Sequence, residues 1–195
     1  MKLAVGLGNP GEAYRATRHN IGYLLIDYLA HHHHIALGTR HHGALLGSGV
    51  IADCKVVLAK PETYMNVSGD AILKIAGFYK LDAADIIVIH DDIDLEFGRI
   101  KIKAGGGSGG HRGVESICAA LLSDSFTRVR IGIGRPPLEY GATEFVLQPF
   151  TDAEQQQLSV IIKNAGQCFE LILSEGPAAA MNTFHKKPVL PPIEN

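Results

Sequence analysis

Four polar side chains that could cooperate in general-base chemistry lie near apolar runs of the sequence, and they belong to Asn9, His19, Asn66 and Asp91. A carboxylate that accepts a hydrogen bond from one imidazole nitrogen fixes the tautomer and makes the other nitrogen a base. His19 and Asp91 have the side chains for this, and the amide of Asn66 can donate to an oxyanion. Ordinary structural roles remain open, because Asn66 also suits a helix cap and Asp91 a turn.

The first loop, Gly6-Leu7-Gly8-Asn9-Pro10-Gly11, has the glycine spacing of dinucleotide-binding turns. In that fold a helix opens at the last glycine, and an acid about 20 residues later binds the ribose. Here Pro10 removes a backbone donor, and residues 11–17 have no apolar face to open a helix. The acid in range, Asp27, lies within the helical spacing of residues 21–30, so we interpret it as a solvated helix residue and do not favour a nicotinamide cofactor.

The elements that must position these side chains alternate between strands and helices. Four consecutive apolar residues at 86–89 predict a central strand buried on both faces, followed by His90, which suits a core position, and by Asp91. Because ligands bind outside the carboxyl ends of such strands, we expect Asp91 and the Asn9 loop to share one crevice. The expected strands are 3–5, 44–51, 55–59, 85–92, 99–103 and 126–134, and the expected helices are 21–30, 67–79, 113–122, 151–175 and 178–184.

Composition limits the class of protein. A chain of 195 residues that is 46% hydrophobic can form one well-packed domain, and no linker-like segment divides it. The formal charge of -2 excludes a generally basic nucleic-acid binder, but not a local basic face. The three cysteines are scattered and indicate neither a disulfide framework nor a thiolate metal site. Without a signal-peptide pattern or an apolar run of about 18 residues, we expect a soluble cytoplasmic protein with no membrane contact.

Residues 99–135 carry seven basic side chains against two acidic ones, although the whole chain is slightly acidic. They flank a glycine-rich segment, 104–110, that lacks the Lys-Ser/Thr ending of a phosphate-binding P-loop. A charge run is usually a solvated face, but one beside a glycine loop also suits a phosphate backbone. The basic residues are Arg99, Lys101, Lys103, Arg112, Arg128, Arg130 and Arg135.

Histidines cluster at residues 31–34 and again at 41–42. Such tracts can bind metals adventitiously. We expect them to lie in a loop with no carboxylate or cysteine beside them, and their spacing fixes no coordination geometry. We therefore interpret them as exposed loop surface and expect no metal site.

Taken together, these segments resemble the bacterial-type peptidyl-tRNA hydrolases. The motifs are GLGNPG with Tyr14 and TRHN, then PETYMNVSG, HDDIDL, GGGSGGHRG and RVRIGIG, in the order and spacing of the family. The match runs from Lys2 to Phe184, and the motifs together are highly specific. The resemblance implies a single α/β domain over residues 1–184, with a twisted, mostly parallel mixed β-sheet surrounded by helices, and a flexible tail over residues 185–195.

The resemblance further implies a monomer without cofactor or metal that hydrolyses the ester between a peptide and tRNA, which recycles tRNA from prematurely released chains. His19 would act as general base on water, and Asp91 would orient the imidazole. Lys103 and Arg130 match family positions that are implicated in binding tRNA phosphates. The positions that match the substrate-binding set are Asn9, Tyr14, Tyr64, Met65, Asn66, Gly110, His111 and Arg112.

One position departs from the family pattern, because Gly110-His111-Arg112-Gly113 stands where Gly-His-Asn-Gly is usual. The family's Asn helps to hold substrate and water, whereas Arg is longer, charged and only a donor, and could instead reach a phosphate. A second hypothesis is a non-catalytic RNA-binding relative, since plant organelle splicing factors share this fold. RNA binding alone needs only the cationic face, so the hydrolase is favoured by the joint presence of Asn9, His19, Asn66 and Asp91.

Overall fold

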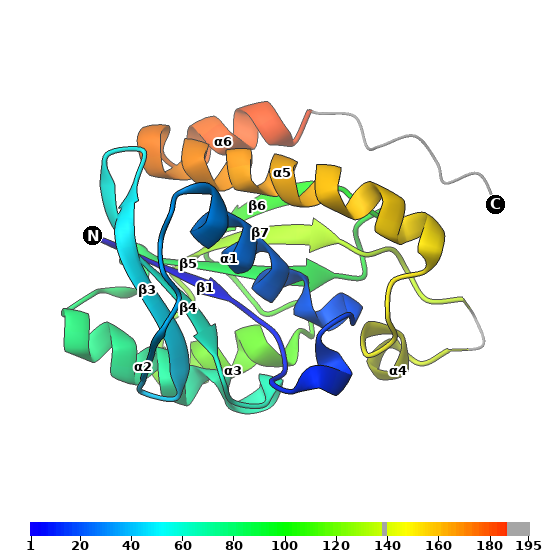
Figure 1. The fold of residues 1–195 in the computed structure, drawn as a ribbon, viewed down its shortest axis with the longest axis horizontal. Helices are drawn as coiled ribbons and strands as arrows, with labels where there is room; N and C mark the ends of the chain where they lie inside the picture. Colours follow the sequence, from blue (N-terminus) through cyan, green and yellow to red (C-terminus); the bar gives the residue numbers. More distant parts are fainter. Residues whose placement is uncertain (138–139, 187–195) are drawn as a thin grey trace.

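The structure is a computed structural model that describes residues 1–137 and 140–186. Its centre is a seven-stranded sheet in the order β2-β3-β4-β1-β5-β7-β6 (Figure 1). The four central strands are parallel, and the outer pairings are antiparallel. The predicted α/β class and the mixed sheet are confirmed. The strands are β1 (Lys2–Gly6), β2 (Thr39–His41), β3 (Ala44–Ile51), β4 (Cys54–Pro61), β5 (Ile86–Asp92), β6 (Ile100–Ala104) and β7 (Thr127–Gly132).

Helices cover both faces of this sheet. In Figure 1, α1, α5 and α6 lie on one side, and α2 and α3 lie on the other. The helices are α1 (Ile21–His32), α2 (Ser68–Tyr79), α3 (Arg112–Leu121), α4 (Ala142–Val146), α5 (Asp152–Glu175) and α6 (Pro177–Phe184), and the short 3-10 helices are η1 (Glu12–Tyr14), η2 (Arg18–Asn20), η3 (Met65–Val67) and η4 (Ala83–Asp85).

The central strand β5 explains why its sequence is an unbroken apolar run. Ile87 and Ile89 belong to the core under α1 and α5, whereas Ile86 and Val88 belong to the core under α2 and α3. Alternate side chains of a strand point to opposite faces, so a strand covered on both sides must be apolar throughout. The run ends where the strand reaches the edge of the cores, and the polar residues follow there.

The glycines of the first loop allow α1 to pack closely against β1. A Cβ at Gly6 would lie 2.3 Å from the carbonyl oxygen of Gly22, and one at Gly8 would lie 2.7 Å from the ring of Tyr23. Asp27, the acid weighed as a ribose ligand, is half-exposed and pairs with Lys60 Nζ at 2.7 Å. The glycine spacing therefore serves the close packing of α1 against β1, and Asp27 serves an ion pair at the surface.

Most predicted elements are present with bounds that differ by a few residues. The capping box of α5 is confirmed, because Thr151 and Glu154 bond each other's backbone amides. The expected mobile tail lies outside the described residues except at its start, where His185 Nε2 accepts from the backbone of Ile102 at 2.9 Å. Among the helices of residues 1–137 and 140–186, none is long and apolar enough to cross a membrane.

Candidate active site

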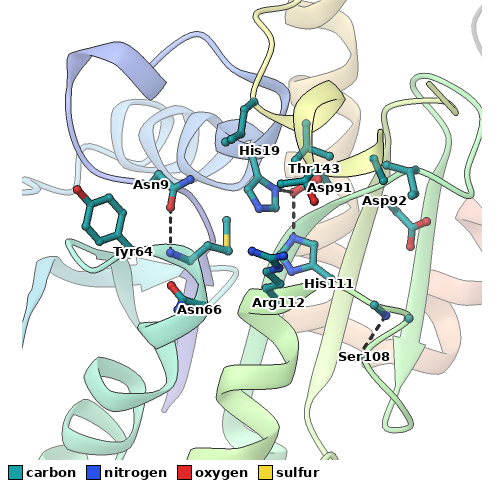
Figure 2. Close-up of a pocket in the computed structure, with 17 residues that line it drawn as sticks. Asn9, His19, Tyr64, Asn66, Asp91, Asp92, Ser108, His111, Arg112 and Thr143 are labelled. Atoms are coloured by element: carbon teal, nitrogen blue, oxygen red, sulfur yellow. Dashed lines mark hydrogen bonds and ion pairs between the residues drawn. The ribbon is translucent and has the colours of Figure 1, made fainter. Parts of the chain in front are cut away.

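A cleft of about 430 Å³ opens at the carboxyl ends of the parallel strands (Figure 2). Asn9 follows β1, Tyr64 follows β4 and Asp91 lies near the end of β5. The expectation that Asp91 and the Asn9 loop share one crevice is confirmed. The lining consists of Asn9, His19, Tyr64, Met65, Asn66, Asp91, Asp92, Ile93, Ser108, Gly109, Gly110, His111, Arg112, Ala142, Thr143, Val146 and Leu147.

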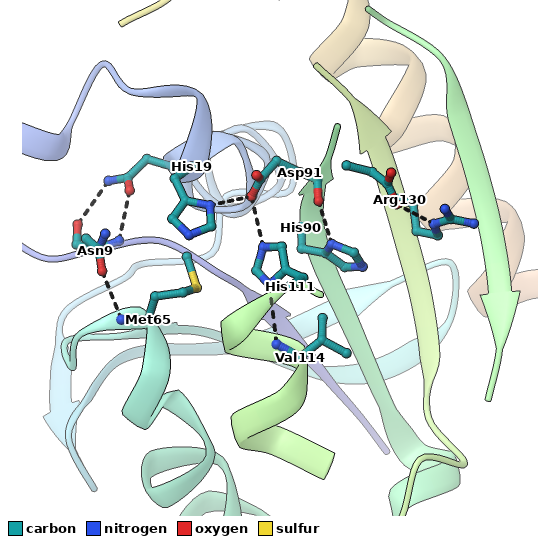
Figure 3. A network of polar contacts seen from close by, with 10 residues as sticks. Asn9, His19, Met65, His90, Asp91, His111, Val114 and Arg130 are labelled. Carbon is teal, nitrogen blue, oxygen red and sulfur yellow. Dashed lines mark hydrogen bonds and ion pairs between the residues drawn. The ribbon is translucent and has the colours of Figure 1, made fainter. Parts of the chain in front are cut away.

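A chain of hydrogen bonds crosses the floor of the cleft (Figure 3). Asp91 Oδ1 lies 2.9 Å from His19 Nδ1 and 3.0 Å from His111 Nε2. His111 stands at the N-cap of α3, where its Nδ1 accepts from the backbone amide of Val114 at 3.3 Å. The contact between His19 and Asp91 agrees with the expected pairing, whereas nothing in the sequence pattern predicted that His111 shares the same carboxylate.

This series of hydrogen bonds determines which ring nitrogens of His19 and His111 carry protons. Since Val114 N–H can only donate, His111 Nδ1 must accept, and the proton of a neutral His111 is on Nε2 and points at Asp91. An ionised Asp91 can only accept, so His19 Nδ1 donates to it as well. In neutral His19 the Nε2 lone pair is then left facing the cleft. Both ring nitrogens of His111, by contrast, are engaged within the protein.

Asp91 is buried with 2% of its surface exposed, yet it stays ionised. Burial alone would raise its pKa, but the two neighbouring imidazoles, His111 and His19, outweigh burial and hold the pKa of Asp91 well below its usual range. His90 is also buried, and burial lowers its pKa well below the usual imidazole value, so this ring is neutral. Its Nδ1 donates to the backbone carbonyl of Asp91 at 2.7 Å, which fixes the end of β5.

Asn9 is held in a single orientation. Its backbone amide donates to Asn20 Oδ1 at 2.8 Å, and its carbonyl accepts from Asn20 Nδ2 at 3.0 Å. Its side-chain Oδ1 accepts from the backbone amide of Met65 at 2.9 Å. The remaining side-chain group, Nδ2, has no hydrogen-bond partner within residues 1–137 and 140–186, and it is a fixed donor at the cleft.

The rim opposite His19 is formed by η3 and the start of α3. Asn66 lies inside η3 and is exposed, and no side chain caps η3 or α2, so the interpretation of Asn66 as a helix cap is wrong. Tyr64 is 61% exposed, whereas Met65 is buried beneath the cleft. Arg112 projects between Asn66 and His111 (Figure 2), and its guanidinium has no partner in the described part of the chain.

One candidate residue lies outside the cleft lining, and one residue without a predicted role holds part of the cleft wall in place. Tyr14 belongs to η1 and is not part of the cleft lining. Arg18, part of the TRHN motif but without a predicted role, is buried and pairs with Glu154 at 2.6 Å, with its guanidinium 4.3 Å from the ring centre of Phe145. Arg18 thereby fastens α4, which supplies one wall of the cleft, next to His19. No periodic apolar signal could predict this five-residue helix.

The buried guanidinium of Arg128 holds the glycine-rich segment in place. Arg128 is 2% exposed, donates to the carbonyl of Gly107 at 2.7 Å and also contacts the carbonyl of Gly106. Lys103 Nζ donates to Gly107 as well, at 3.3 Å. The prediction that Arg128 belongs to a basic face is wrong, because its guanidinium is enclosed beneath the loop.

Two other basic side chains of residues 99–135 pair with acids that precede this segment in the chain. Arg130 Nε pairs with Asp92 Oδ2 at 2.7 Å beside the cleft, and Arg135 pairs with Asp94 at 2.9 Å in solvent. Lys103 and Arg130 both lie on the ribbon of β6 and β7, next to the glycine-rich segment. The basic surface is therefore smaller than the composition of residues 99–135 indicated.

Two groups of potential metal ligands occur among the described residues. One is His19, Asp91 and His111, whose atoms are already paired donor to acceptor in the chain described above. The other is His32, His33 and Glu170, outside the cleft. The expectation that the histidine tract lies in a loop away from any carboxylate is wrong, since α1 extends through His32 and Glu170 lies 2.9 Å from His33.

Comparisons with known proteins agree with this geometry. The sequence profile described as "Peptidyl-tRNA hydrolase" matches residues 3–191. A peptidyl-tRNA hydrolase of Mycobacterium bovis (strain BCG / Pasteur 1173P2) is 48% identical over 188 residues, covering 94% of this chain and 96% of the relative. One from Lachnoclostridium phytofermentans is 42% identical over 189 residues, covering 97% of this chain and 99% of the relative.

A solved structure matches as well. The crystal structure of peptidyl-tRNA hydrolase from Acinetobacter baumannii superposes with a TM-score of 0.89 and 35% sequence identity, and the match covers 95% of each chain. The resemblance noted in the sequence is thus confirmed along nearly its whole length. The chain belongs to the peptidyl-tRNA hydrolase family, enzymes that act on the ester bond of peptidyl-tRNA.

Proposed function

We propose that this cleft hydrolyses peptidyl-tRNA by means of a water molecule that His19 activates. The observation that carries the proposal is the 2.9 Å contact between His19 Nδ1 and the ionised Asp91, inside a cleft that also holds two asparagine amides. Asp91 acts as the orienting group, because it fixes the tautomer in which His19 Nε2 can accept a proton. It also stabilises the imidazolium that forms when the proton arrives.

The reaction follows from this tautomer. Water attacks the carbonyl carbon of the ester while one of its protons moves to His19 Nε2. The tetrahedral intermediate then collapses, the bond to the ribose oxygen breaks, and that oxygen takes the proton back from His19. The products are a peptide carboxylic acid, which releases the remaining proton of the water to solvent as it ionises, and a tRNA with a free ribose hydroxyl.

Two amides suit the negative charge that develops on the carbonyl oxygen. Asn66 is the donor that we assign to the oxyanion, since it lies on the open rim without a structural hydrogen bond among the described residues. Asn9 offers Nδ2, which is held in place through its own Oδ1. A donor that is fixed before the substrate arrives loses no orientational freedom in the transition state.

The other expected substrate contacts follow from their places on the lining. Tyr64, Met65 and Gly110 offer apolar or backbone contacts to the aminoacyl group, and His111 offers its ring edge. Arg112 offers an unpaired cation to a phosphate of the tRNA end or to a peptide carbonyl. Tyr14 lies beyond the lining, so we assign it to a part of the substrate that extends past the cleft.

Binding of the tRNA body is assigned to Lys103 and Arg130 on the ribbon of β6 and β7. Arg130 uses Nε for Asp92, and its terminal amino groups are left for a phosphate. Peptidyl-tRNA arises in translation, so we place the protein in the cytoplasm, where it acts as a monomer.

The test is release of N-acetyl-amino acid from N-acetyl-aminoacyl-tRNA in the presence of EDTA, by the wild type, by His19→Ala and by His41→Ala as a matched surface control. Loss of the base should reduce kcat by about 10²- to 10⁴-fold, while the control keeps its rate. If a folded wild type binds the tRNA but releases nothing, the chain is instead a non-catalytic RNA-binding relative. A normal rate for His19→Ala would remove the assignment of the base.

A further inference from the structure

The histidine tract lies where the end of α1 meets α5. Tyr28 and His32 are four residues apart on α1, and Gly166 and Glu170 are four apart on α5, so each pair lies on one face of its helix. A Cβ at Gly166 would come within 2.5 Å of Tyr28 Cε1. The glycine thus lets the Tyr28 ring rest against α5, and this brings the last turn of α1 beside Glu170.

Two imidazoles and one carboxylate converge at this junction. His33 Nε2 lies 2.9 Å from Glu170 Oε1, and the His32 and His33 ring centres are 4.9 Å apart. The His32 ring stacks on Tyr28, with an angle of 9° between the ring planes, which limits its rotation. One ligand atom of each of these three side chains lies within 4.8 Å of the others.

We propose that His32, His33 and Glu170 form a binding site for a divalent transition metal of the zinc class. Zinc bonds of about 2.0–2.2 Å in a tetrahedral arrangement place the ligands roughly 3.4 Å apart, so the three ligand atoms, which now lie within 4.8 Å of one another, must come closer by small side-chain adjustments to close the site. His33 is 20% and Glu170 31% exposed in their side chains, which leaves a path for the ion and a coordination position for water. Two neutral imidazoles and one carboxylate are ligands that zinc accepts.

The site is separate from the catalytic cleft. α1 has 12 residues and begins next to His19 and Asn20, so its end lies about 18 Å along the helix axis from the cleft. A metal here would join the end of α1 to α5 and stabilise the folded chain without touching the substrate. It would also replace the 2.9 Å contact of His33 Nε2 with Glu170 Oε1.

The experiment is a Zn²⁺ titration of the full chain without a purification tag at pH 7.5, followed by calorimetry and by thermal unfolding. We expect one Zn²⁺ per chain and, at a hundredfold excess over Kd, a rise in Tm of roughly 5–10 °C. Glu170→Gln and His33→Gln should each weaken binding by at least about tenfold and remove most of the rise. His31→Gln takes an exposed imidazole from the same tract and should leave Kd within about twofold.

Other outcomes overturn the proposal. If His31→Gln weakens binding as much as His33→Gln, the tract chelates zinc without Glu170 and there is no built site. The same conclusion follows if Glu170→Gln binds as tightly as the wild type. If the ion that binds also abolishes hydrolysis, and His19→Ala loses that binding, then zinc occupies the cleft cluster instead of the junction of α1 and α5.

Discussion

Replacing Asp91 with asparagine tests the floor of the cleft, because it changes charge with almost no change in shape. In the wild type the carboxylate accepts from His19 at 2.9 Å and from His111 at 3.0 Å. Asparagine keeps one acceptor oxygen but loses the negative charge that stabilises an imidazolium. The amide nitrogen can also point at His19 and favour the wrong tautomer.

The size of the effect follows from this contact. A charge-assisted hydrogen bond contributes about 1.5–3 kcal/mol. Two unit charges with centres about 4 Å apart interact by roughly 4 kcal/mol at an effective dielectric constant near 20, which sets an upper limit for this enclosed site. Since each 1.36 kcal/mol is a factor of ten in rate, we expect Asp91→Asn to reduce kcat by about 10- to 1000-fold.

Single-turnover hydrolysis of N-acetyl-aminoacyl-tRNA measures this loss, and the Kd for the same tRNA should stay within about twofold because Asp91 carries no substrate contact in the proposal. His111→Gln serves as a matched comparison, since it removes the second donor to the carboxylate but leaves the pair of Asp91 with His19. A wild-type rate for Asp91→Asn would refute the reasoning. A loss that falls wholly on Kd would do so as well.

Arg130→Ala removes one expected phosphate contact, so its Kd for tRNA, measured in an inactive His19→Ala background, should rise less steeply with salt than the Kd of the His19→Ala parent, by a factor of about three between about 50 and 200 mM. Arg135→Ala, which breaks an exposed ion pair, is the control, and equal salt slopes for the two variants would contradict the assignment. Arg128→Met leaves two carbonyls of the glycine-rich segment without their donor, so it should lower both the free energy of unfolding, by about 1–3 kcal/mol, and kcat/KM. Urea unfolding and steady-state kinetics measure these two losses. An unchanged kcat/KM would show that the reaction does not depend on this anchor of the loop. Because the imidazoles hold the pKa of Asp91 below its usual range, its carboxylate contributes stability that is complete above the unfolded-state pKa of about 3.9 and is lost as pH falls further. The difference in unfolding free energy between wild type and Asp91→Asn should therefore not fall between pH 8 and 5 but should shrink below about pH 4. If this difference already shrinks near pH 6, burial raises the pKa of Asp91 instead.

Much of the fold could be predicted, because its strands and long helices have clear periodicity. The run at 86–89 indicated a doubly covered strand, and β5 is one. The strand β2 (Thr39–His41) was missed since its three residues are exposed and polar. Their pairing with β3 comes from backbone hydrogen bonds, which leave no pattern in the side chains.

The site was only partly predictable for a similar reason. The sequence predicted that Asp91 and the Asn9 loop share one crevice, because strand ends in an α/β sheet meet at one edge, and it indicated His19 as a possible partner of Asp91. It gave no sign that Arg128 turns inward or that Asp92 pairs with Arg130, since local charge does not reveal the direction of a side chain. The partner of His33 was hidden too, because Glu170 lies more than a hundred residues away in the chain.

The central claim is that His19 is the general base, and chemical rescue tests it most directly. Single-turnover hydrolysis of N-acetyl-aminoacyl-tRNA is measured for His19→Ala with and without added imidazole, at saturating enzyme and with EDTA present. The account predicts a loss of about 10²- to 10⁴-fold that imidazole partly restores, while imidazole leaves the wild-type rate unchanged. A folded His19→Ala variant that hydrolyses the substrate at the wild-type rate without imidazole would contradict it.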